Sequence, residues 1–298
     1  MLWNRRRMLG SLALAPVVAA CPSLVRATEQ GRSVLAADYG AKRLGMISPE
    51  GKLVWEFPIR DLHDLWVLDN GHILCQRHFG EVVELDKERK VVWEYDARKS
   101  NGNEGKRVEV HAFQRLADGL TMVVESGPGR ILEVDRSGKI ASEVQLTVKQ
   151  PDPHRDTRLA RKLASGNYLV CHEKDQAVRE YDGAGKVVWQ YDVGAQVYSA
   201  ERLENGHTLV GTGGGHSVVE VDATGKEVWR VGENDIPGVK LVWVTLVERL
   251  ANGNTRIVNC HAGPENPQIV EVTPKKELVW SFKDFQNFGN SLPMARVV

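Results

Sequence analysis

The sequence predicts an all-β protein, a six-bladed β-propeller of four-stranded antiparallel blades, because two sequence markers repeat in step along the chain. The first marker is an apolar strand that occurs six times. It carries Ser142 in the third copy and Trp at the same place in the other five: Trp55, Trp93, Trp189, Trp229 and Trp280. The second marker is Leu-x-x-Gly, ending at Gly71, Gly119, Gly166, Gly206 and Gly253. The first marker returns after 38, 49, 47, 40 and 51 residues, a period typical of propeller blades, in which the tryptophans pack blade on blade.

Each repeat contains four short strands. The second repeat shows them at residues 63–68, 72–76, 81–85 and 91–95, with the tight turn Asp69-Asn70-Gly71 after the first. A sheet of this size cannot bury both of its faces alone. We therefore expect each repeat to pack against its neighbours.

The two ends of the chain are expected to close the ring. The first repeat has only three strands, at residues 33–38, 43–48 and 52–57, so its inner strand is missing. Residues 290–298 resemble the inner strands of the other repeats. If this segment pairs into the first blade, the two exposed edges of an open array disappear. The sequence thus predicts a propeller that is closed by its C-terminal strand.

Residues 1–27 have the features of an export signal, and residues 28–298 are expected to form a single propeller domain. Arg5-Arg6-Arg7 precedes an apolar run, and Val25-Arg26-Ala27 ends in the small residue that signal peptidase needs. The arginines resemble a twin-arginine signal, which exports folded proteins. This pattern predicts a periplasmic or secreted protein.

A lipoprotein is the alternative for the same segment. Val18-Ala19-Ala20-Cys21 resembles a lipoprotein box, in which Cys21 would carry the lipid anchor. The apolar run itself is short and is interrupted by Pro16 and Pro22, so no transmembrane segment is predicted.

Composition excludes some classes of partner. The chain has a formal net charge of zero, which becomes −4 when residues 1–27 are removed with their four arginines. No basic run follows the N-terminal segment, so we expect no nucleic acid partner. Cys75, Cys171 and Cys260 lie in different repeats and are expected to be small buried side chains rather than disulfides.

The topology separates two faces of the ring. Strand direction alternates, so the short Asn-Gly and Gly-Lys turns share one face, and the long connections share the other, which we call the top face. Seven of the nine histidines fall on the top side: His63, His78, His111, His154, His172, His216 and His261. Because binding residues concentrate in irregular loops on a rigid scaffold, the top face is the predicted binding face.

The mouth of the central channel is the predicted site. Inner strands begin near the axis, eight residues before each Leu-x-x-Gly glycine, and this position together with its neighbours gives the candidate ligand-binding residues His63, Asp64, His111, Arg158, Tyr198, Trp243, Thr245 and Asn290. Polar groups above an apolar channel are typical of a ligand-binding funnel. The imidazoles could transfer protons or bind metal, but their spacing forms no local metal-binding motif, and no metal is assigned.

Two repeat segments are LENGHTLV at 203–210 and VVEVDATGKEVW at 218–229. Repeats of this kind resemble those of pyrroloquinoline-quinone (PQQ)-like propellers and of the bacterial arylsulfotransferase group. The resemblance covers almost the whole chain after the signal and implies a propeller, since the matching residues are structural.

Two enzymatic alternatives follow from the resemblance. An arylsulfotransferase-like or hydrolase activity would use a channel histidine, His63 or His111, with Arg158 for the sulfate charge. A PQQ-type oxidoreductase would bind PQQ, with Trp243 as a stacking surface, but the quinone enzymes resemble eight-bladed rings with adjacent cysteines, and this chain has no such pair. No nucleophile with its base can be assigned, so whether the protein is an enzyme stays open. The preferred hypothesis is an exported propeller that binds a small molecule or an envelope protein.

Overall fold

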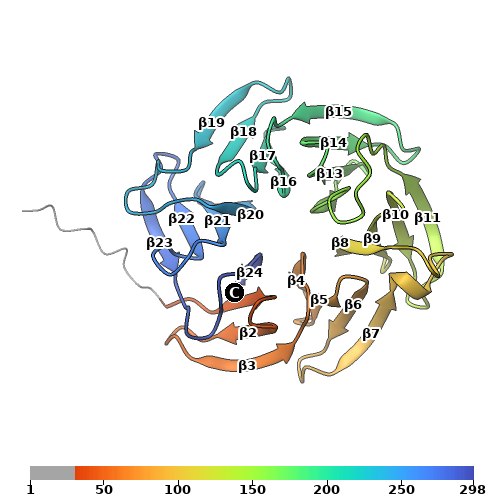
Figure 1. The fold of residues 1–298 in the computed structure, drawn as a ribbon, viewed down its shortest axis with the longest axis horizontal. Helices are drawn as coiled ribbons and strands as arrows, with labels where there is room; N and C mark the ends of the chain where they lie inside the picture. Colours follow the sequence, from red (N-terminus) through yellow and green to blue (C-terminus); the bar gives the residue numbers. More distant parts are fainter. Residues whose placement is uncertain (1–30) are drawn as a thin grey trace, which may run out of the picture.

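The chain folds into six four-stranded antiparallel sheets around a central axis (Figure 1), and the C-terminal strand completes the first of them. The computed structural model describes residues 31–298. The expected export signal at residues 1–27, including Cys21, lies outside the described residues. The predicted fold class, an all-β propeller with six four-stranded blades, is confirmed.

The blades are numbered in chain order and their strands are given from the axis outward. Blade one contains β24 (Met294–Val297), β1 (Val34–Asp38), β2 (Arg43–Ile47) and β3 (Leu53–Pro58). Blade two contains β4 (Leu65–Val67), β5 (Ile73–His78), β6 (Glu81–Leu85) and β7 (Val91–Asp96), and is followed by the short 3-10 helix η1 (Ala97–Lys99). Blade three contains β8 (Glu109–Arg115), β9 (Thr121–Ser126), β10 (Arg130–Val134) and β11 (Ile140–Gln145).

The second half of the ring repeats this order. Blade four contains β12 (Ala160–Lys162), β13 (Tyr168–His172), β14 (Ala177–Tyr181) and β15 (Val187–Asp192). Blade five contains β16 (Ser199–Arg202), β17 (Thr208–Gly211), β18 (Val218–Val221) and β19 (Glu227–Val231). Blade six contains β20 (Trp243–Arg249), β21 (Thr255–Cys260), β22 (Ile269–Val272) and β23 (Leu278–Phe282).

The C-terminal strand closes the ring as predicted. β24 pairs antiparallel with β1, from Val34 opposite Val297 to Ala37 opposite Met294. In Figure 1 the blue β24 therefore lies beside the red strands of blade one, between the inner strands β4 and β20. Because β24 fills the inner position of blade one, the first and last parts of the described chain share one sheet.

The repeated Leu-x-x-Gly marker is the turn between the first two strands of a blade. In blade two, Gly71 N donates to Leu68 O at 2.7 Å, and Gly71 has φ of 78°. A backbone in this left-handed region strains residues that have a side chain, so glycine is favoured. The marker thus records backbone geometry rather than ligand binding.

The repeated tryptophans join neighbouring blades, and three of them are less buried than the sequence suggested. Trp93 and Trp280 are buried, whereas Trp55, Trp189 and Trp229 are partly exposed on the outer strands. Trp189 Nε1 nevertheless donates to Ala223 O of the next blade at 3.0 Å. Each ring is partly covered by an arginine rather than by apolar side chains alone.

This arginine belongs to a recurring contact that we call the Arg–Trp–Glu clasp. An arginine of one blade lies over the tryptophan of the preceding blade and pairs with a glutamate on that blade's third strand. The clasps are Arg115 with Trp93 and Glu84, Arg202 with Trp189 and Glu180, Arg249 with Trp229 and Glu220, and Arg32 with Trp280 and Glu271. Where Ser142 replaces the tryptophan, the arginine is also replaced, by Lys162, which pairs with Glu133. These recurring residues therefore hold each blade against its neighbour.

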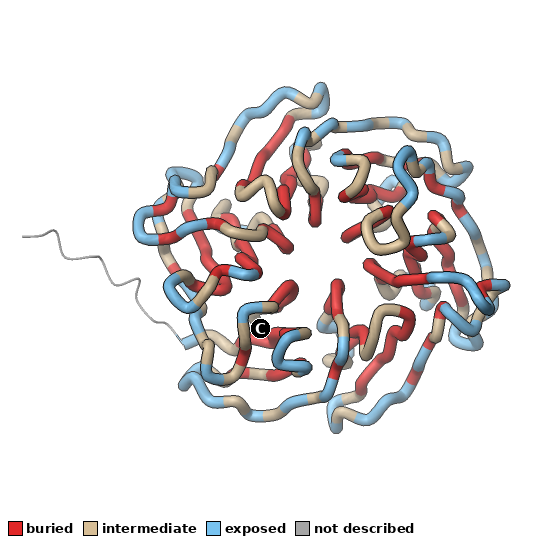
Figure 2. The backbone as a smooth tube through the Cα atoms, viewed as in Figure 1, coloured by how far each residue is buried: buried red, intermediate tan, exposed pale blue. Residues whose placement is uncertain are grey.

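The core follows the inner strands. Figure 2 shows buried residues concentrated near the axis and exposed residues on the outermost strands. The predicted burial of Cys75, Cys171 and Cys260 is confirmed, and none of the three forms a disulfide. Burial raises the pKa of the Cys75 thiol to about 12. Within residues 31–298, no helix has the length and apolar character that crossing a bilayer requires.

Candidate functional site

A cavity of about 370 Å³ opens at the top mouth of the channel. Its wall is built from connections between an outer strand and the next inner strand, and between second and third strands. These are the connections that the topology assigned to the top face. The lining residues run from Tyr39 in blade one to Pro293 before β24, so the cavity is a product of the closed ring.

Five of the predicted residues line this cavity: His63, Arg158, Tyr198, Trp243 and Thr245. The inner strand of blade two is shorter than predicted, so His63 lies just before β4 rather than within it. His111, on β8, is fully buried and lies behind His63, with ring centroids 4.4 Å apart.

The remaining two predicted residues are not among those that line the cavity. Asp64 is fully buried and accepts hydrogen bonds from Arg161 at 2.7 and 3.0 Å, which ties blade two to blade four across the channel. Asn290 is exposed at the rim, where its Oδ1 accepts from Gly263 N at 2.7 Å. Asp64 thus connects two blades, and Asn290 holds the backbone of a neighbouring loop.

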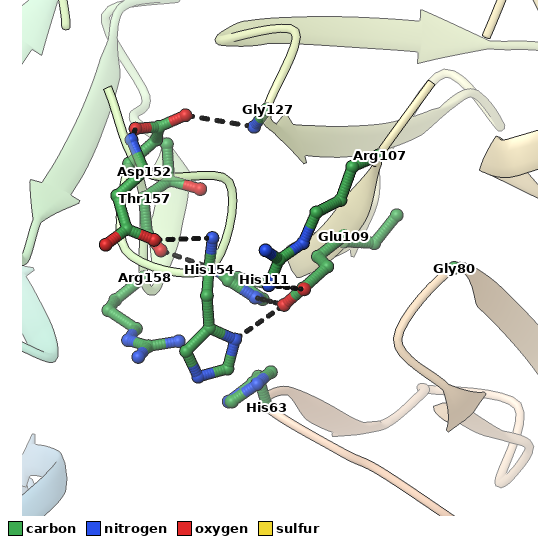
Figure 3. A network of polar contacts seen from close by, with 12 residues as sticks. His63, Gly80, Arg107, Glu109, His111, Gly127, Asp152, His154, Thr157 and Arg158 are labelled. Atoms are coloured by element: carbon green, nitrogen blue, oxygen red, sulfur yellow. Dashed lines mark hydrogen bonds and ion pairs between the residues drawn. The ribbon is translucent and has the colours of Figure 1, made fainter. Parts of the chain in front are cut away.

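Three histidines that lie on or before the inner strands of blades two, three and four converge at the cavity (Figure 3). His63 precedes β4, His111 lies on β8, and His154 belongs to the long connection before β12. One potential ligand atom from each of the three side chains lies within 4.8 Å of those from the other two. We call His63, His111 and His154 the histidine cluster.

Each ring of the histidine cluster has one nitrogen held by an outer group. His63 Nδ1 lies 2.6 Å from Tyr198 Oη, and His111 Nδ1 donates to Thr157 O at 2.7 Å. His154 Nδ1 lies 2.6 Å from Glu109 Oε2. His63 Nε2 is buried and has no hydrogen-bond partner among residues 31–298. His63 Nε2 is therefore open to a ligand, whereas His111 Nε2 also lies 3.2 Å from Glu109 Oε2.

Burial makes the two inner imidazoles weak bases. It holds the pKa of His63 well below its ordinary value of 6.5, with the nearby charges of His111 and Arg158 acting in the same direction. It also lowers the pKa of His111 to about 4.

Arg158 and Glu173 form a buried ion pair in the cavity wall. Their side chains are only 5% and 2% exposed. Arg158 also lies against the Tyr198 ring, with Cζ 5.4 Å from the ring centroid. Its Nη1 is buried and finds no hydrogen-bond partner in the described part of the chain. The two N–H groups of Nη1 are thus left for a ligand.

Several residues of the site were not selected from the sequence. Glu109 and Glu173 lie at the ends of strands, where a repeat alignment gives them no special mark. His154 was recognised as a top-face histidine, but its connection has no counterpart in other repeats that could place it at the mouth. Tyr39 and His261 also line the cavity, joined by a 3.0 Å contact between Tyr39 Oη and His261 Nε2. Tyr39 lies in the connection between β1 and β2, where no repeat marker distinguishes it.

Comparison with known proteins gives one family match. The model of the family described as outer membrane protein assembly factor BamB, a PQQ-like repeat family, matches residues 127–276. No curated protein sequence matches the chain.

Solved structures share the architecture. A protein of unknown function from Bacteroides caccae is 26% identical with a TM-score of 0.77, and the match covers 89% of this chain and 98% of that one. Virginiamycin B lyase from Staphylococcus aureus is 12% identical with a TM-score of 0.58, over 86% of this chain and 85% of the lyase. A streptogramin B lyase is 13% identical with a TM-score of 0.59, over 89% and 86%. At such identities the two lyases share the fold alone.

Proposed function

The chain belongs to the PQQ-like repeat family described as outer membrane protein assembly factor BamB, and from this premise we propose that it is an exported binding propeller whose top cavity holds a small molecule. The ligand would carry an oxygen that accepts hydrogen bonds, as in a carboxylate, a sulfate ester or a sugar, and an apolar body. A cavity of about 370 Å³ lies at the small end of the range of ligand sites, about 300–1,000 Å³.

The observation that carries this proposal is the unpartnered Nη1 of Arg158. An unsatisfied buried donor costs about 1–3 kcal/mol, which a ligand oxygen would recover. The Arg158 charge is already balanced by Glu173, so the site favours a ligand oxygen that accepts hydrogen bonds from Nη1 rather than a ligand of opposite charge. Phe79 and Trp243 supply aromatic surface in the same wall for the apolar part.

A binding screen with a matched variant tests the proposal. The purified protein would be heated with carboxylates, sulfate esters, sugars, and PQQ with calcium, and hits would be measured by calorimetry. Trp243→Ala, in the cavity wall, should weaken binding at least about tenfold. Trp229→Ala, on the outer strand β19, is the control and should leave the affinity unchanged. The proposal would fail if no compound bound, or if both variants bound equally well.

Export is part of the same proposal. It is supported by Arg5-Arg6-Arg7 before an apolar run, and by a family whose description names the outer membrane. We place the start of the propeller domain at residue 28. Cell fractionation of the wild type and of Arg5→Lys/Arg6→Lys tests this, because a twin-arginine signal loses export when the pair is replaced. Incorporation of labelled fatty acid, lost in Cys21→Ser, would instead identify a lipoprotein.

A protein partner is the second candidate, favoured by apolar residues on the outside of the ring. The residue before the repeated tryptophan is an exposed valine in four blades: Val54, Val92, Val188 and Val228, which are 56, 45, 47 and 47% exposed. The outer strands also have a free edge, which an extended segment of an envelope protein could extend by strand pairing. A photo-crosslinker at position 188 should then capture one partner that a crosslinker at Val67, an exposed residue on β4, does not. Equal capture from both positions would count against it.

A further inference from the structure

The rings of the histidine cluster are arranged as ligands around one point. Their centroids are 4.4, 5.5 and 5.9 Å apart, and the ring planes are inclined by 61–87°. Imidazoles that bind one zinc ion at about 2.0–2.1 Å in tetrahedral directions have centroids about 5 Å apart. The spacing of the three rings thus already matches a shared ion. Since His154 is 38% exposed on a long connection, it can supply the movement of about 1 Å that brings the nitrogens to binding distance.

The outer hydrogen bonds fix which nitrogen each ring presents. Tyr198 Oη, Thr157 O and Glu109 Oε2 each contact the Nδ1 of one histidine. Metal-binding histidines characteristically give their other nitrogen to a carboxylate, carbonyl or similar group, which sets the tautomer. The arrangement leaves Nε2 as the ligand atom in every ring. His63 Nε2 meets the stricter condition of a buried nitrogen without a partner in the part of the chain that the structure describes.

A second feature calls for a positive charge at the same place. His111 Nδ1 donates to Thr157 O, so the Nε2 of a neutral ring carries a lone pair. That nitrogen lies 3.2 Å from Glu109 Oε2, which is also an acceptor. Two acceptors at this distance repel each other unless a cation or proton lies between them. A metal ion bound to both nitrogens would remove this repulsion and would also give His63 Nε2 a partner.

We propose that His63, His111 and His154 bind one divalent transition-metal ion of the zinc type through their Nε2 atoms, with Glu109 balancing its charge. Imidazole ligands suit zinc, copper, nickel and iron, whereas magnesium and calcium prefer oxygen. Three protein ligands leave a further coordination position open, as in metal sites that bind substrates. The three histidines can bind the ion without any other molecule. Only the further step, that the small molecule in the cavity occupies the open coordination position, rests on the proposed function.

The test uses the metal alone. Purified protein is stripped with a chelator, dialysed and titrated with Zn²⁺, and Co²⁺ is added separately because its absorption spectrum reports nitrogen ligands. We expect one ion per chain, a dissociation constant of about 1 μM or below, and no comparable binding of Mg²⁺. His154→Ala, which changes a partly exposed side chain, should weaken Zn²⁺ binding at least about 100-fold.

His207→Gln is the matched control. In the wild type, His207 Nδ1 also contacts a glutamate oxygen, Glu220 Oε1, at 2.7 Å. His207 lies on the turn side of blade five and does not belong to the histidine cluster. Zn²⁺ affinity should stay within about twofold of the wild type, against the 10–100-fold losses seen when groups around a metal site are removed. No bound Zn²⁺, equal losses in both variants, or equally tight binding of Mg²⁺ would overturn the proposal. A protein that binds Zn²⁺ but no small molecule would keep the metal site and contradict only the proposed function.

Discussion

Arg202 lies over the Trp189 ring, with Cζ 4.6 Å from the ring centroid, and its Nη2 donates to Glu180 Oε2 at 2.7 Å. Arg202 belongs to blade five, and the other two residues belong to blade four. The same relationship recurs around the ring, so the tryptophan that reveals the repeat is half of a contact between blades. Blade packing in this propeller depends on charge and aromatic surface as well as on apolar burial.

Breaking one clasp should destabilise the fold. Arg202→Ala removes the stacking contact and leaves Glu180, whose side chain is 15% exposed, without its cation. The expected loss in the free energy of unfolding is about 2 kcal/mol, since both groups are partly solvated. Arg202→Lys should lose less, because it keeps the charge. Urea unfolding measures both, and Arg60→Ala, at an exposed position, is the control. Equal stability of Arg202→Ala and Arg60→Ala would show that the clasp contributes nothing.

The fold could be predicted because the marker residues have structural roles that recur at the same position in successive blades. Gly71 and its counterparts have positive φ angles that favour glycine. Trp189 donates a hydrogen bond to Ala223 O of the next blade. Closure through β24 followed from counting strands. Partial exposure of Trp189 was not foreseen, because the covering residue, Arg202, comes from another repeat.

The site could be predicted only where it follows the repeat. His63 and His111 share one repeat position and do lie together. Asp64 was chosen as the neighbour of His63, but both residues precede β4, and the Asp64 side chain instead pairs with Arg161. His154 reaches the cluster from a connection of irregular length, whose path depends on tertiary contacts that no repeat encodes.

Closure by β24 should be essential for stability. Deleting residues 293–298 removes the strand that pairs with β1 and the fully buried side chains of Met294 and Ala295. The loss should be at least about 4 kcal/mol from backbone hydrogen bonds and apolar burial together. Thermal unfolding followed by circular dichroism should show a much lower or absent transition. Deleting Val298 alone, which is 55% exposed, should change little. An unchanged transition in the long deletion would mean that blade one is stable with three strands.

Stability should fall in mild acid because of His172. Burial, with the nearby Arg179 charge, lowers the pKa of His172 to about 4, and the ring bonds Asp156 O and Tyr181 Oη. The unfolded chain takes up this proton near pH 6.5. Between pH 6.5 and 4 the unfolded state therefore binds more protons, and stability decreases as pH falls through this window. The cost from this one residue between pH 7 and pH 5 is about 2 kcal/mol.

His172→Gln isolates this contribution. Glutamine can still donate to Asp156 O and accept from Tyr181 Oη, but it does not titrate. Urea unfolding at pH 7 and pH 5 should show a decrease that is smaller in His172→Gln than in the wild type by about 2 kcal/mol. If the two proteins lost the same free energy, the pH dependence would belong to other groups.

The ion pair of Arg158 and Glu173 should show strong coupling. Both side chains are almost fully buried, so removing one partner leaves an uncompensated charge. Arg158→Met should lower the free energy of unfolding by about 3–5 kcal/mol. Arg158→Met/Glu173→Gln should be more stable than Arg158→Met, because the remaining carboxylate has been replaced by an amide that can still meet Gln196. A second substitution that restores stability is the signature of a buried pair. If the losses of the two single variants simply added in the double variant, Glu173 would be balanced by water or by another cation, and the Arg158 guanidinium would be free to meet the full charge of an anionic ligand in the cavity.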